Sequence, residues 1–128
     1  MKTLYVSDLD GTLLNRAAAL SASTRDRLTR LIEDGVEFTV ASARGVGSMR
    51  SVLAGLKLRL PVIGFNGAFI SDLATGRHER VNSIDAELAR DLHGLIAGHG
   101  IPPVIATYSG SEDLVYYHEP HNAGMHWW

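Results

Sequence analysis

Two carboxylates separated by one leucine follow directly on an apolar run near the start of the chain, in the segment SDLDGTLL at residues 7–14. Removing a charge from water costs several kcal/mol unless a partner compensates it. Asp8 and Asp10 are therefore either turn residues at the surface or members of a site that supplies a positive charge. The preceding run, TLYV at residues 3–6, is apolar and rich in strand-forming residues, which predicts a parallel strand covered on both faces.

The first half of the chain alternates strand and helix patterns. The spacing of its apolar residues predicts helices over residues 20–35 and 49–56. Strands are predicted at residues 36–43 and 61–65, the second of them ended by the turn signal Asn66-Gly67. Strands and helices that alternate in this way are typical of an α/β fold with a parallel sheet.

The second half follows a different pattern. A hairpin is predicted around Thr75-Gly76, a helix that starts at Ile84 and ends in the Gly-His-Gly at residues 98–100, and two antiparallel strands around Gly110. We therefore expect two parts. Residues 1–80 would form an α/β core with three parallel strands and two helices, and residues 81–128 would begin an α+β unit.

Composition narrows the class of protein. A chain of 128 residues with 45% hydrophobic and 20% charged residues is too apolar for disorder. A net charge of -2 gives no electrostatic reason to bind nucleic acid or an acidic membrane, and no apolar stretch approaches the ~20 residues that span a bilayer. The chain lacks cysteine and shows no signal-peptide pattern, so we expect a soluble, cytoplasmic protein without a membrane or nucleic-acid partner.

Polar residues stand at the end of each predicted parallel strand: Asp8 with Asp10, Ser42 with Arg44, and Asn66. Ligands of parallel α/β sheets bind beyond the carboxyl ends of the strands. Turns also favour Asp, Asn and Ser, which would explain any one of these positions alone. All three strand ends together favour a binding site.

The spacing of the two aspartates carries its own chemistry. In an extended chain, residues two apart direct their side chains to one face. Crowded carboxylates repel, so we expect the pKa of Asp8 or Asp10 to rise unless a cation sits between them. Mg²⁺ would serve, because it takes oxygen ligands and favours carboxylates shared with a substrate phosphate. Gly11 permits backbone conformations that a side chain would forbid, and the Thr12 hydroxyl can bond backbone groups at the turn.

These residues resemble a known family. DLDGTLL after an apolar strand is similar to the first motif, DxDGT, of the haloacid dehalogenase (HAD) superfamily of phosphohydrolases. VASAR at residues 40–44 resembles the second motif of that superfamily, in which a Ser or Thr closes the second strand. The Arg that follows, together with FNGA at residues 65–68, is similar to the Cof-type branch, in which a large α/β cap follows the third strand. The resemblance implies a HAD-like Rossmannoid parallel sheet, in part, with the beginning of an α+β cap.

The resemblance also implies a reaction. Asp8 would attack phosphorus and form an aspartyl-phosphate, and Asp10 would act as general acid and then general base. Mg²⁺ would be bound by the Asp8 carboxylate and the Asp10 carbonyl, and Ser42 would hold a phosphate oxygen. The residues implied to bind the phosphate or line the substrate pocket are Leu9, Gly11, Ser42, Ala43, Arg44, Asn66 and Gly67.

The substrate implied is a small phosphorylated metabolite. Two further motifs of the superfamily, a Lys and an acidic pair, normally follow the cap, and the resemblance implies that residues 1–128 end within the cap and hold neither motif. Lys57 precedes the third strand and does not fit the first of these motifs. A non-catalytic fragment that self-associates through the exposed edge of the strand bearing Asp8 is therefore the alternative hypothesis.

Three other patterns are weaker. A receiver-like signalling domain also takes phosphate on an Asp at a strand end, but its acceptor lies on a middle strand, which does not fit Asp8. RGVGSMR at residues 44–50 follows the second strand, and it has Arg where a dinucleotide-binding loop needs Gly or Ala. His118, His121 and His126 lack the helical or hairpin frame of a zinc site.

Overall fold

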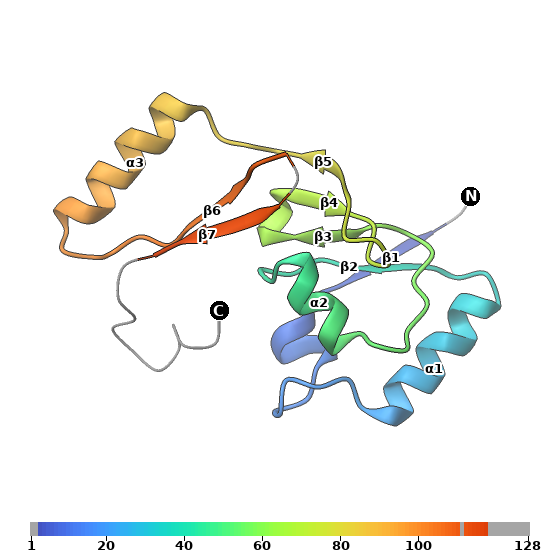
Figure 1. Ribbon diagram of the computed structural model, residues 1–128. Coiled ribbons are helices and arrows are strands. Elements are labelled where there is room, and N and C mark those ends of the chain that lie inside the picture. The colour runs from blue at the N-terminus through green and yellow to red at the C-terminus, as the bar shows by residue number, and fades with distance from the viewer. Residues whose placement is uncertain (1–2, 111, 118–128) are drawn as a thin grey trace. The chain divides into compact units, whose positions relative to one another are not determined.

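The computed structural model describes residues 3–110 and 112–117. The chain separates into two compact units, Met1–Ser83 and Ile84–Trp128, here unit 1 and unit 2 (Figure 1). The histidines at positions 118, 121 and 126 lie outside the described residues. Within those residues, none of the helices combines the length and apolarity needed to cross a membrane.

Unit 1 has the alternating order expected of an α/β fold. Its strands and α-helices are β1 (Leu4–Ser7), α1 (Ala22–Glu33), β2 (Glu37–Val40), α2 (Val46–Val52), β3 (Val62–Gly64), β4 (Phe69–Ser71) and β5 (His78–Val81). Two short helical turns, Leu9–Leu13 and Phe65–Gly67, follow β1 and β3 directly. Both turns contain residues with non-helical backbone angles, so they change the direction of the chain without extending a helix.

The parallel strands stand in the order β1-β2-β3. β1 pairs in parallel with β2, in the register Leu4 opposite Glu37 through Ser7 opposite Val40. β3 joins β2 through one parallel bridge, Ala41 to Ile63, and continues into the antiparallel sheet β3-β4-β5. The predicted mixed α/β fold with a parallel sheet is confirmed, although β3 makes most of its strand contacts with β4.

The core of unit 1 lies between its helices and strands. Fully or nearly fully buried side chains come from the turn after β1, from both helices and from the inner strands: Leu9, Ile32, Val40, Met49, Leu53 and Val62. Ser21 caps α1, because its hydroxyl accepts a hydrogen bond of 3.1 Å from the Thr24 amide. The packing of these buried side chains holds the strands in place, and with them the loops at their ends.

The second helix is shorter than predicted. α2 begins at Val46 and ends at Val52, four residues before the predicted end at Leu56. Gly55 has a φ of +86°, a conformation that no right-handed helix includes, so the chain leaves the helix before it. Leu56 is nevertheless buried in the same core, which explains why its spacing resembled that of a helix.

The first strand is more exposed than predicted. Leu4, Tyr5 and Val6 are exposed, Tyr5 to 56%. In the described part of the chain, β1 pairs with β2 alone, so it forms an edge of the sheet. The expectation that this strand is covered on both faces is therefore wrong for the chain as it stands.

Unit 2 contains α3 (Ala86–Gly98) and an antiparallel pair, β6 (Ile105–Tyr108) with β7 (Asp113–Tyr116). The Asp85 carboxylate caps α3 by accepting hydrogen bonds from the amides of Glu87 and Leu88. The apolar residues of α3 are exposed to solvent: Leu88, Leu92, Leu95 and Ile96.

Candidate active site

Backbone hydrogen bonds bring three strand ends together in unit 1. The Ala41 amide donates to the Ser7 carbonyl at 2.9 Å, which joins the end of β1 to the end of β2. Ser42 bonds both the third strand and the turn after it. Its amide donates to the Ile63 carbonyl at 2.9 Å, and its carbonyl accepts from the Asn66 amide at 3.0 Å. The carboxyl ends of β1, β2 and β3 therefore form one continuous edge.

The turn after β1 presents both aspartates to solvent. Leu9 between them is fully buried and anchors the turn in the core, whereas Asp8 and Asp10 are exposed. Gly11 has a φ of +78°, which lets the chain reverse, and the Leu14 amide closes the turn on the Leu9 carbonyl at 2.8 Å. The segment is thus a tight turn, although Asp8 (φ −71°, ψ 161°) and Asp10 (φ −76°, ψ 121°) both keep extended backbone angles.

The carboxylate of Asp10 is paired with Arg44. Two hydrogen bonds of 2.7 Å, from Nε and from Nη2 of Arg44, reach the two carboxylate oxygens. These bonds lower the pKa of Asp10 and raise that of Arg44, and the opposite charges act in the same direction. The Arg44 guanidinium also donates to Ser48 Oγ at 2.9 Å. The cation required beside the two aspartates is thus supplied, for Asp10, by the protein.

Asp8 is exposed, and its carboxylate takes no part in the ion pair between Asp10 and Arg44. Its Oδ2 accepts a hydrogen bond of 3.3 Å from the Thr12 hydroxyl, which steadies the side chain across the turn. The Ser7 hydroxyl bonds the carbonyl of Asp8 at 2.8 Å. An exposed carboxylate at the end of a rigid strand is available to an electrophile or a metal ion.

Ser42 lies next to this carboxylate edge and is 5% exposed. Its Oγ accepts a hydrogen bond of 3.2 Å from the Arg44 amide, which fixes the position of the oxygen. The hydroxyl proton can therefore be donated to a ligand oxygen. Ala43, between Ser42 and Arg44, is exposed, so the backbone of this segment is also accessible.

The turn after β3 has a strained backbone. Phe65, Asn66 and Gly67 have φ values of 46°, 55° and 98°. Asn tolerates the left-handed region, but an aromatic residue there costs about 1–3 kcal/mol and persists only where its surroundings hold it. The Arg44 carbonyl does so in part, because it accepts a hydrogen bond of 3.1 Å from the Phe65 amide.

The donors at this edge fit a hard divalent cation only in part. Within residues 3–110 and 112–117, no three His, Asp or Glu side chains gather into a metal-binding group. The Asp8 carboxylate and the Asp10 carbonyl are oxygen donors of the kind that Mg²⁺ prefers, and Mg²⁺ usually keeps several water ligands. The Asp10 carboxylate is committed to Arg44, so it fits the metal less well than the two donors just named.

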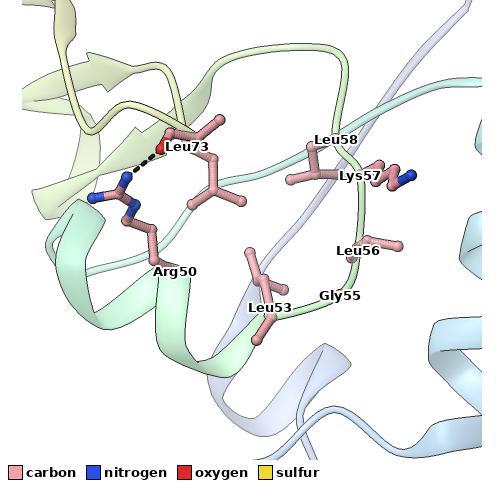
Figure 2. A pocket seen from close by; sticks show the side chains of 9 residues that line it. Arg50, Leu53, Gly55, Leu56, Lys57, Leu58 and Leu73 are labelled. Carbon is pink, nitrogen blue, oxygen red and sulfur yellow. Dashed lines mark hydrogen bonds between the residues drawn. The ribbon is translucent and has the colours of Figure 1, made fainter.

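A pocket of about 350 Å³ lies away from this edge (Figure 2). Leu53, Leu58 and Leu73 converge on it, and Arg50 at its rim bonds the Ala74 carbonyl. β4 runs antiparallel to β3, so the turn that holds Ala74 lies toward the amino end of β3. Lys57 also lines this pocket.

Sequence reasoning missed two polar residues near the site. Ser48 follows Arg44 by four residues, a spacing at which side chains on helical turns meet, so the pattern could have indicated it. Asn82 donates from its side-chain amide to the Gly67 carbonyl at 2.8 Å, and no spacing in the sequence pointed to that contact.

Two phosphatases of Bacillus subtilis are similar to this chain in sequence. The phosphatase YitU of Bacillus subtilis, named for 5-amino-6-(5-phospho-D-ribitylamino)uracil, is 29% identical over 118 residues, covering 90% of this chain and 42% of that protein. The phosphatase YwpJ of the same species is 35% identical over 89 residues, covering 70% of this chain and 31% of its own. The chain thus spans less than half the length of these two relatives.

Solved structures of haloacid dehalogenase-type proteins are also similar to this chain. A haloacid dehalogenase-like hydrolase from B. subtilis superposes with a TM-score of 0.75 at 27% identity, covering 96% of this chain and 41% of that one. A phosphatase of the haloalkanoate superfamily from Bacteroides thetaiotaomicron gives 0.69 at 25% identity, covering 94% and 43%. The profile of the haloacid dehalogenase-like hydrolases matches residues 5–126. The resemblance seen in DLDGT is thereby confirmed, and the chain belongs to the haloacid dehalogenase-like hydrolase family.

Proposed function

We propose that this chain carries the nucleophile and the phosphate-binding serine of an Mg²⁺-dependent phosphatase that acts on a small phosphorylated metabolite. The observation that carries the proposal is the position of Asp8, exposed at the end of β1 beside the Asp10–Arg44 pair and Ser42. The two B. subtilis relatives named as phosphatases support the reaction class.

In the first step a carboxylate oxygen of Asp8 attacks phosphorus, and the bond from phosphorus to the ester oxygen breaks. Asp10 gives a proton to the departing oxygen, and an aspartyl-phosphate is left on Asp8. In the second step a water attacks phosphorus while Asp10 takes its proton, which releases phosphate and restores Asp8. Bound Mg²⁺ supplies compensation for the negative charge between nucleophile and phosphate.

Arg44 links the binding of the substrate to the two reaction steps, through its ion pair with Asp10. While the guanidinium holds Asp10, the carboxylate is ionised, which suits a base and not an acid. A phosphate dianion carries more charge than a carboxylate and also accepts two parallel hydrogen bonds, so it competes for Arg44. Asp10, once released from the guanidinium, takes up from solvent the proton that it then gives to the departing oxygen. Ser42 and the turn at Asn66 and Gly67 would hold the remaining phosphate and substrate oxygens. The backbone of three neighbouring residues would line the same phosphate site: Leu9, Gly11 and Ala43.

The substrate class stays broad in this proposal. A sugar phosphate, a phosphorylated cofactor precursor and a nucleotide all carry the required monoester. The name of YitU makes a phosphorylated ribityl compound a sensible member of the test panel. We place the reaction in the cytoplasm, where such metabolites occur, with no nucleic acid or membrane as partner.

An alternative is a non-catalytic chain that self-associates. The observation that favours it is the exposed β1, which pairs with one strand only in the described residues. An unpaired strand edge with exposed apolar residues tends to pair with another chain. A homo-oligomer through this edge is the form we propose.

Hydrolysis of p-nitrophenyl phosphate by the 128-residue chain with Mg²⁺ decides between these functions. Asp8→Asn should lower turnover at least about 10³-fold, because it removes the nucleophile. Asp26→Asn, a matched change of an exposed acid on α1, should leave turnover unchanged. Equal turnover in the Asp8→Asn chain contradicts the phosphatase mechanism. A folded wild-type chain without turnover supports the non-catalytic alternative.

A further inference from the structure

We propose that Asn82 is a positioning residue that holds Asn66 at the carboxyl edge of β3, and so ties the end of unit 1 to the candidate site. The role of Asn66 toward the substrate rests on the proposed phosphatase function. The mechanical link between Asn82 and the turn at Phe65–Gly67 does not.

Asn82 touches this turn through two hydrogen bonds. Its side-chain Nδ2 donates to the Gly67 carbonyl at 2.8 Å, and its backbone amide donates to the Ala68 carbonyl at 2.7 Å. The two contacts hold consecutive peptide units immediately after Asn66. One residue thus restrains both the carbonyl and the direction of the chain at the exit of the turn.

The amide of Asn82 is itself oriented. Arg80 Nε donates to Asn82 Oδ1 at 3.0 Å, which identifies the oxygen side of the amide and leaves Nδ2 to face Gly67. The pairing of Val81 with Phe69 fixes the end of β5 next to the start of β4. The position of Asn82 is therefore set by the sheet, independently of the turn that it holds.

The other side of the turn is held by β2. The Asn66 amide donates to the Ser42 carbonyl at 3.0 Å, and the Phe65 amide donates to the Arg44 carbonyl at 3.1 Å. The left-handed backbone of Phe65 and Asn66 persists only while such contacts over-determine it. Asn82 supplies the contact opposite Ser42, so the turn relaxes when that contact is removed.

Asn82 lies next to the boundary between the two units. Unit 1 ends at Ser83, the residue that follows Asn82. A displacement of the chain where it passes into unit 2 therefore acts on Asn82 first, and through Gly67 on Asn66. In a phosphatase this would couple the connection between the units to the residues that receive the substrate.

Two variants test the link against a matched control. Asn82→Ala removes the side-chain bond, and Asn82→Asp keeps the shape and the acceptor for Arg80 but has no donor for Gly67. Thr75→Ala, at the opposite end of the β4–β5 hairpin, removes the bond from the Arg77 amide to Thr75 Oγ1. The Thr75→Ala change therefore weakens the β4–β5 hairpin at the end that lies away from Phe65–Gly67.

Amide hydrogen exchange by NMR is the first measurement. In both Asn82 variants the Asn66 amide should exchange about fivefold to tenfold faster, the effect of losing one ordinary hydrogen bond. In Thr75→Ala the Asn66 amide should keep its rate. Unchanged Asn66 exchange in both Asn82 variants, or equal acceleration in Thr75→Ala, overturns the proposal.

Kinetics with p-nitrophenyl phosphate is the second measurement. The Asn82 variants should raise KM about fivefold with little change in kcat, because they displace a binding residue and leave Asp8 in place. A lower kcat at unchanged KM overturns the positioning role. If the wild-type chain has no turnover, the phosphatase proposal fails for this chain, while the exchange rates still decide the link.

Discussion

Arg44 and Asp10 form a two-bonded ion pair, with both hydrogen bonds at 2.7 Å, between the end of β2 and the turn after β1. The two residues are separated by 34 positions in the sequence. This side-chain contact joins the same two segments that the backbone bond from the Ala41 amide to the Ser7 carbonyl connects. The pair is partly exposed, so it contributes at most about 1 kcal/mol to stability.

Removal of Arg44 should therefore change the titration of Asp10 more than the stability of the fold. In Arg44→Gln the pKa of Asp10 should rise toward the ordinary value of about 3.9. The measurement is an NMR titration of the Asp10 carboxyl carbon. Arg27→Gln, an exposed change on α1, serves as the control. An Asp10 pKa that stays depressed in Arg44→Gln would show that another group lowers it.

The same pair predicts the sign of a pH effect. The pKa of Asp10 is lower in the folded state, so its contribution to stability is fully present above the unfolded pKa of about 3.9 and is lost as pH falls through the folded value. Urea unfolding between neutral pH and about pH 3 should therefore show a slightly steeper loss in wild type than in Arg44→Gln. Parallel curves for the two proteins contradict the linkage.

Ser42→Ala should weaken the binding of inorganic phosphate in the presence of Mg²⁺ by about tenfold, because one hydrogen bond to a charged ligand is lost. Binding is followed by NMR shifts of the amides at residues 42–44. Ser51→Ala, an exposed serine on α2, is the control and should bind as wild type does. Equal phosphate affinity in Ser42→Ala would remove this residue from the site.

Two glycines separated by one residue, Gly45 at the cap of α2 and Gly47 within the helix, should respond in opposite ways to alanine. At Gly45 an added Cβ would lie 2.9 Å from the Phe65 ring, whereas at Gly47 it would meet open space. Gly45→Ala should lower the free energy of unfolding by about 1–3 kcal/mol through overpacking. Gly47→Ala should raise it by about 0.5–1 kcal/mol through helix propensity. Urea denaturation measures both, and a stable Gly45→Ala variant would mean that the Phe65 ring moves freely.

The edge of β1 predicts self-association. Val6 on β1 and Leu31 on α1 are 48% and 47% exposed, so they form a matched pair. Val6→Lys should convert the chain to a monomer, because a charge on an edge strand opposes pairing with a second chain. Leu31→Lys should leave the association unchanged. Sedimentation velocity distinguishes these outcomes, and a monomeric wild-type chain refutes the proposed interface.

The sequence predicted those parts of the fold whose cause is local. Apolar spacing identified α1, and the Asn66-Gly67 signal identified the turn after β3, because short-range sterics and hydrogen bonds decide these features. The sequence also predicted that the polar residues after the parallel strands lie along one edge, since the carboxyl ends of parallel strands meet at the same edge of a sheet.

Features that depend on distant contacts could not be predicted. The pairing of Asp10 with Arg44 and the contact of Asn82 with Gly67 each join segments that approach only in the folded chain. The exposure of β1 depends on which strands are present to cover it, so the residues of β1 alone predicted a covered strand. Only the comparison with the motifs of the family led to the alternative hypothesis of an exposed edge. The early end of α2 follows from the left-handed Gly55, whose effect the spacing of Leu56 concealed.

The hydrogen bonds described at the candidate active site all come from residues that precede Ile84, where unit 2 begins. Unit 2 can therefore be replaced or redesigned without removing any of those bonds, provided that the connection after Asn82 is kept. A graft between two related chains should therefore be joined after Ser83, so that Asn82 keeps its bonds to Gly67 and Ala68.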